Sequence, residues 1–149
     1  MKIMTAPRAK ASVYGKTFIA VDVSGSARRE QLAHGIKKAE SIARAFGVTE
    51  ASYIAFDHKI EFEKKTRLGK VGVDALMKHG GCGSDLRELF YRLDDCMNPG
   101  LVFVVTDMLL PFPELNPVSK ATFVWIITEE TLLPRWPTFG LFINSSREQ

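Results

Sequence analysis

The sequence has 149 residues, 46% of them apolar and 25% charged, which suits one globular domain with a sizeable hydrophobic core. Its net charge of +3 is only mildly basic and no recognition motif accompanies it, so a nucleic-acid partner is not expected. The sequence has no long apolar run, no signal-peptide pattern and no cysteine framework, which predicts a cytoplasmic protein without a membrane span.

The two ends of the chain differ in character from its centre. Several lysine and arginine residues precede the first acidic residue, which is typical of a solvated basic arm. The last residues are polar and follow the last apolar run, as expected of a frayed end. We therefore predict an arm over residues 1–16, one domain over residues 17–144 and a frayed end over residues 145–149.

The first half of the domain alternates between strand and helix patterns. Thr17–Val23 is short and rich in β-branched and apolar residues, which predicts a buried strand. Ala27–Phe46 carries apolar residues at helical spacing, and Gly47 is a typical helix stop. Ala51–Phe56 is predicted as the second strand, and Lys59–Glu63 as a short third strand that pairs antiparallel with it.

The second half continues the alternation. Val73–Lys78 is predicted as a short helix. Apolar residues from Leu86 to Met97 recur at helical spacing, and Asp85 with Glu88 has the spacing of a capping pair at the start of this helix. Three further strands are expected over Leu101–Thr106, Ala121–Ile127 and Thr138–Ile143.

Prolines interrupt the last two connections, over residues 107–120 and 128–138, and they exclude a long regular helix there. Side chains such as Phe112 and Trp136 either fold back over the sheet or leave one face thinly covered, and we expect them to fold back. The whole pattern predicts an α/β fold with an open, mainly parallel, doubly wound sheet of about six strands flanked by helices.

Oxygen-bearing side chains stand where three segments leave or enter the predicted elements. In an open parallel sheet, ligands bind outside the carboxyl ends of the strands, so we expect these segments to meet. Carboxylates and hydroxyls without thiolate or imidazole form a donor set suited to Mg²⁺. The alternative is that each residue only caps a helix or satisfies backbone groups. The candidate metal ligands are Asp22, Ser24, Ser26, Ser84 and Asp107.

The segment DVSGS at residues 22–26, followed in order by Ser84 and Asp107, resembles the metal-ion-dependent adhesion site (MIDAS) of von Willebrand factor A (VWA) domains. That family has Thr where this chain has Ser84. The loop GGCGSD and the strands VFVVTD and FVWIIT look most like a bacterial VWA-like group that commonly accompanies a metallopeptidase-like region. The resemblance implies a Rossmann-like sheet with strand order 3-2-1-4-5-6, and Mg²⁺ or Mn²⁺ as the ion.

The same resemblance implies a metal-dependent protein–protein interaction module or adaptor. In such a module, an Asp or Glu of the partner protein completes the Mg²⁺ shell, and the partner can be an AAA+ ATPase or a metallopeptidase-like protein. One alternative is a metal-dependent hydrolase, and another is a metal-free scaffold that binds through the side bearing Phe112 and Trp136. The chain has no HExxH helix and no second Asp two residues after Asp22, so we expect no catalysis by this polypeptide alone.

Overall fold

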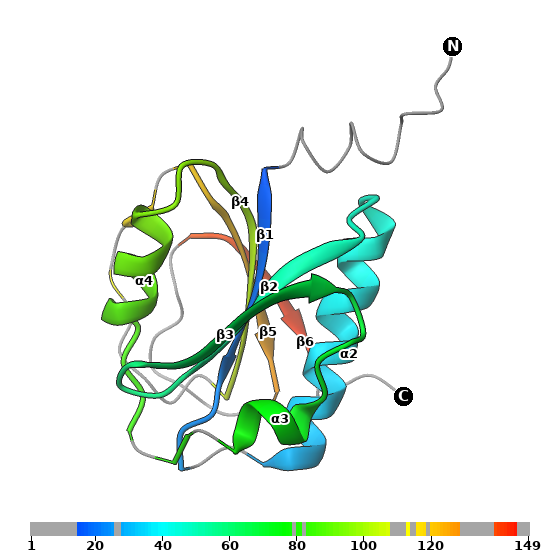
Figure 1. Cartoon of the computed structure of the whole chain (residues 1–149), viewed down its shortest axis with the longest axis vertical. Helices are drawn as coiled ribbons and strands as arrows, with labels where there is room; N and C mark the ends of the chain where they lie inside the picture. Colours follow the sequence, from blue (N-terminus) through cyan, green and yellow to red (C-terminus); the bar gives the residue numbers. More distant parts are fainter. Residues whose placement is uncertain are drawn as a thin grey trace.

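The computed structural model describes residues 15–25, 28–78, 80–81, 83–107, 113, 116–118, 120–128 and 139–145. Within these residues, a six-stranded sheet lies between helices on its two faces (Figure 1). The strands are β1 Lys16–Asp22, β2 Glu50–Phe56, β3 Ile60–Arg67, β4 Pro99–Thr106, β5 Thr122–Ile127 and β6 Leu141–Asn144. The helices are α2 Arg29–Ala45, α3 Val73–Met77 and α4 Arg87–Asp94.

The strands follow the order β3-β2-β1-β4-β5-β6, and only the β2–β3 pair of this sheet is antiparallel. This order confirms the predicted doubly wound fold. β1 lies at the centre, where Val21 pairs with Ala55 of β2 on one side and with Val105 of β4 on the other. A strand in this position is buried on both faces, which explains why its sequence is apolar without alternation. The carboxyl ends of β1, β2, β4 and β5 therefore meet at one edge of the sheet.

Each face of the sheet carries its own hydrophobic core. The helices α2 and α3 cover one face, and α4 covers the other (Figure 1). On the first face, Ile19 and Val21 pack with Leu32 and Ile36 of α2. The helix approaches the sheet closely at Gly35, where an added Cβ would lie 2.6 Å from Cγ1 of Val105. The buried residues on the second face include Phe18, Leu89, Val102, Val104, Phe123 and Trp125.

Two elements differ from their predicted lengths. β3 reaches Arg67, well beyond the predicted end at Glu63, because its polar residues pair along the whole of β2 and face solvent at the edge of the sheet. Helix α4 ends at Asp94, so the prediction that Met97 belongs to its apolar stripe is wrong, and Met97 is 92% exposed. The cap at the start of α4 also differs, because Asp85 accepts the backbone N–H of Arg87, two residues on, at 2.9 Å.

The ends of the domain also differ from expectation. Lys16 is the first residue of β1 rather than the end of an arm. Ser145 is buried and donates a 2.9 Å hydrogen bond to the carbonyl of Ile127, so the predicted fraying is wrong at this residue. The rest of the predicted arm and frayed end, and the expected cover from Phe112 and Trp136, lie outside the described residues.

Candidate functional site

Asp22 is the last residue of β1 and stands at the centre of the carboxyl edge of the sheet. It pairs with Phe56 on the β2 side. On the β4 side, Val21 pairs with Val105, and this register puts Thr106 beside Asp22. The neighbouring strands leave Asp22 only 1% exposed. The sheet therefore holds one carboxylate in a fixed, nearly dry position between two other strand ends.

Three chain segments, two of them distant from Asp22 in the sequence, donate hydrogen bonds to this carboxylate. The backbone N–H of Ser24 lies 3.1 Å from Oδ1. The hydroxyl of Ser84 donates to the same oxygen at 2.8 Å. The hydroxyl of Thr106 donates to Oδ2 at 2.9 Å. The turn after β1, the loop before α4 and the end of β4 thus converge on Asp22, and these are the three segments that we expected to meet.

Glycine allows the loop before α4 to approach β1 closely. A Cβ on Gly80 would lie 2.2 Å from Cγ2 and 2.3 Å from the carbonyl oxygen of Val23. A Cβ on Gly25 would lie 3.1 Å from the carbonyl oxygen of Gly81, which has a φ of +132°. The two distances at Gly80, 2.2 and 2.3 Å, are too short for a Cβ atom. Glycine at position 80 therefore lets the loop carry Ser84 to Asp22.

Burial and hydrogen bonding act in opposite directions on Asp22. Burial raises the pKa of its carboxyl above the ordinary value, while hydrogen bonds from Ser84, Thr106 and Ser24 oppose that shift. Desolvation is the larger effect, so the charged form is disfavoured at this position. A cation bound at the carboxylate would offset that penalty, and the oxygen donors around it suit a hard divalent ion.

The structure brings some of the predicted metal ligands together. Asp22, Ser24 and Ser84 lie together, with Ser24 buried and Ser84 half-buried. Asp107 is buried and follows directly after β4 at the same edge. Ser26 lies outside the described residues. Thr106 was not among the predicted ligands, although it stands in the third of the segments that we expected to meet.

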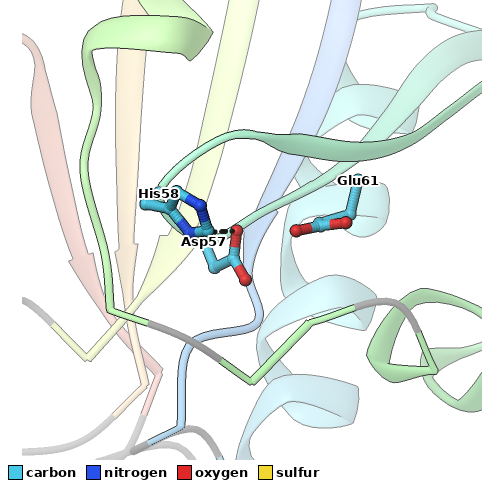
Figure 2. Close-up of side chains that lie close together, drawn as sticks. All are labelled: Asp57, His58 and Glu61. Carbon is cyan, nitrogen blue, oxygen red and sulfur yellow. Dashed lines mark ion pairs between the residues drawn. The ribbon is translucent and has the colours of Figure 1, made fainter.

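A second group of polar side chains at this edge was also missed. Asp57, His58 and Glu61 each offer a ligand atom, and these atoms all lie within 4.8 Å of one another (Figure 2). His58 lies exposed in the turn between β2 and β3. The signal for the group was Asp57, which follows β2 directly, much as Asp22 ends β1.

One cavity among the described residues lies away from this edge of the sheet. Its volume is about 700 Å³, and it lies near the amino ends of β1 and β2, lined by residues that include Lys16, Phe18, Ser52 and Met97. Arg92 lines it as well, and its guanidinium group is held to Glu63 by hydrogen bonds of 2.8 and 2.6 Å. None of the candidate metal ligands lines this cavity. This cavity is therefore separate from the candidate ligands that the structure describes.

Comparison with curated proteins finds no match. Among the helices of the described residues, none is both long and apolar enough to span a membrane. The sequence does match the family described as VWA-like domain (DUF2201), and the match covers residues 17–145. This range runs from the second residue of β1 to the buried serine that follows β6, and so includes all of the sheet except Lys16. The chain therefore belongs to the VWA-like domain family DUF2201.

Proposed function

We propose that this chain is a metal-dependent protein-interaction module of the MIDAS type. VWA-like domains often act as interaction or adaptor modules, and membership of the family supports this class of function. The observation that carries the metal dependence is the convergence of three chain segments on the buried carboxylate of Asp22. That arrangement gathers oxygen donors at the edge of the sheet where ligands of open parallel sheets bind.

The proposed ligands of the ion are Asp22, Ser24, Ser26, Ser84 and Asp107. The ion would be Mg²⁺ or Mn²⁺, because all the donors are carboxylate or hydroxyl oxygens. The bound ion supplies a positive centre that can accept an oxygen from outside the chain. Two carboxylates and several neutral hydroxyls leave the site able to attract an acidic group, so the partner is a protein that presents Asp or Glu. By resemblance, an AAA+ ATPase or a metallopeptidase-like protein is the partner to try first.

One observation favours a second candidate function, a metal-free scaffold. The carboxylate of Asp22 already accepts hydrogen bonds from Ser24, Ser84 and Thr106. Such a network satisfies a buried carboxylate without any ion. In that case, the same residues hold the loops of the carboxyl edge together, and partner binding does not depend on Mg²⁺.

Calorimetric titration with Mg²⁺ and with Mn²⁺ separates the two functions. The module predicts saturable binding to the native chain and none to the Asp22→Ala variant. Asp94→Ala is the matched control, because Asp94 is exposed at the end of α4 and its loss should leave the binding unchanged. Ser84→Ala serves as a milder site variant in case Asp22→Ala fails to fold. If a correctly folded native chain shows no saturable binding of either ion, the metal-free scaffold replaces the module.

A further inference from the structure

We propose a second cation site, formed by Asp57, His58 and Glu61 at the turn between β2 and β3, which takes a transition-metal ion of the Zn²⁺ class. The site has its own residues and its own ligand chemistry. It therefore goes beyond the proposed function and does not rest on it.

The turn holds the first of these ligands in place. The backbone N–H of Lys59 donates to Oδ1 of Asp57 at 3.2 Å, and the N–H of Asp57 donates to the carbonyl of Lys59 at 3.0 Å. Asp57 is 1% exposed, so its carboxylate has one orientation. His58 is exposed, and Glu61 is partly buried on β3 with its carboxylate pointing towards Asp57 (Figure 2). One buried ligand and two more exposed ones thus lie together at the turn.

The distances suit a small ion. Zn²⁺ binds nitrogen and oxygen at about 2.0–2.2 Å, so two ligand atoms of a tetrahedral site lie about 3.4 Å apart. Nδ1 of His58 lies 3.3 Å from Oδ1 of Asp57, which is already close to that spacing. All three ligand atoms lie within 4.8 Å of one another, so no pair is wider than that spacing by more than about 1.4 Å.

The ligand types decide which ion is favoured. Imidazole is a common ligand of Zn²⁺ and its neighbours in the transition series, whereas Mg²⁺ prefers oxygen donors. Two carboxylates this close to each other repel when both are charged, and a divalent ion between them removes the repulsion. Three protein ligands leave the fourth tetrahedral position to water or to a group from a partner.

The proposed site adjoins the Asp22 cluster without sharing a ligand with it. The backbone N–H of Asp85 donates to the carbonyl of Asp57 at 2.8 Å, which joins the β2–β3 turn to the loop that carries Ser84. A Zn²⁺-class ion at the turn would therefore sit on the same edge of the sheet as Asp22. Both sites would face the same side of the molecule, and the edge would present two different metal centres.

The test is a titration of the native chain with Zn²⁺, repeated with Co²⁺, whose visible absorption reports tetrahedral coordination. We expect one saturable site, at least a tenfold loss of Zn²⁺ affinity in His58→Ala and in Glu61→Gln, and a tetrahedral Co²⁺ spectrum without a thiolate band. His34→Ala is the matched control, because His34 is exposed on α2 and its loss should change nothing. Asp22→Ala should also retain Zn²⁺ binding, which separates this site from the one proposed for Mg²⁺.

Three results would overturn the proposal. The first is no saturable Zn²⁺ binding by the folded native chain. The second is Zn²⁺ affinity that survives both His58→Ala and Glu61→Gln, since the ion would then use other donors. The third is an NMR titration in which the His58 ring responds to pH but not to Zn²⁺, because the imidazole would then take only a proton.

Discussion

The hydroxyl of Ser84 donates a 2.8 Å hydrogen bond to Oδ1 of Asp22, although 62 residues separate the two in the sequence. The contact depends on the loop before α4 lying against the turn that follows β1. It joins a side chain from a glycine-rich loop to the central strand of the sheet. A small hydroxyl at this point can either donate to the carboxylate or bind an ion with its oxygen, so its replacement tests both roles.

Replacing Ser84 should separate the hydroxyl from the rest of the side chain. Ser84→Ala removes the donor to a buried carboxylate and should lower the free energy of unfolding by about 1–3 kcal/mol. It should also weaken Mg²⁺ binding by about tenfold or more, whereas Ser84→Thr keeps the hydroxyl and should bind at least as well as the native chain. Urea unfolding and calorimetry measure the two effects. Equal loss of Mg²⁺ affinity in both variants would contradict a role for the hydroxyl as a ligand.

The raised pKa of Asp22 predicts how stability depends on pH in the absence of metal. Because burial raises the pKa of this carboxyl in the folded state, folding favours its protonated form. The stability contributed by that form is complete below the ordinary pKa of 3.8 and is lost as the pH rises through the folded value. Asp22→Asn cannot ionise, so it should become progressively more stable relative to the native chain as the pH increases.

The measurement is urea unfolding of both proteins between about pH 4 and pH 7 with a chelator present. The difference between the two proteins is the relevant quantity, because other carboxyls, such as Asp85 beside Arg87, have a lowered pKa and act in the opposite direction. Saturating Mg²⁺ at pH 7 should stabilise the native chain and not the variant. A stability difference that stays constant across this pH range would show that the ionisation of Asp22 does not affect folding.

Most of the fold could be predicted from the sequence. The buried strands were predicted because their apolar runs end at turn residues, and α2 because its apolar residues follow a helical period. β3 was predicted too short because it is rich in charged residues, and only pairing with β2 keeps them in a strand. Met97 was assigned wrongly because its spacing fits a helix that in fact ends at Asp94.

The candidate metal site was partly predictable for a similar reason. Asp22 and Ser84 stand at the ends of predicted elements, and the rule that ligands bind at the carboxyl ends of strands brings them together. In the group of Asp57, His58 and Glu61, only Asp57 follows this rule, because it comes directly after β2. Its members meet because β3 turns back antiparallel to β2, and the sequence alone does not fix how the side chains of that turn are oriented.

The close approach of Gly80 to β1 should be essential for the site. In Gly80→Ala, the new Cβ would meet both the side chain and the carbonyl oxygen of Val23, and the backbone contact cannot be relieved by a rotamer change. The loop must shift, so stability should fall by about 1–3 kcal/mol and Mg²⁺ affinity should fall with it. Gly83→Ala is the control in the same loop, because its Cβ would have no neighbour within 4 Å among the residues that the structure describes. Similar losses in both variants would mean that loop flexibility matters and not the contact with Val23.

A buried pair outside the site, Tyr53 and Glu40, should stabilise the fold. The hydroxyl of Tyr53 donates to Oε2 of Glu40 at 2.5 Å, and the backbone N–H of Gly69 donates to both oxygens, at 3.0 and 3.2 Å. Burial and the neighbouring Glu40 raise the pKa of Tyr53, so its hydroxyl remains a donor across the usual pH range. The pair therefore ties α2 and β2 to the turn that follows β3.

Tyr53→Phe removes this donor. Among the described residues, the buried carboxylate of Glu40 then keeps a hydrogen bond only from the N–H of Gly69. The free energy of unfolding should fall by about 1–3 kcal/mol, as measured by urea denaturation. Tyr91→Phe is the matched control, because Tyr91 is 66% exposed and its hydroxyl can bond to water in both states. Mg²⁺ affinity should be unchanged in both variants, since Tyr53 lies outside the Asp22 cluster. Native-like stability of Tyr53→Phe would mean that water replaces the hydroxyl at Glu40, and the pair would then contribute nothing to the fold.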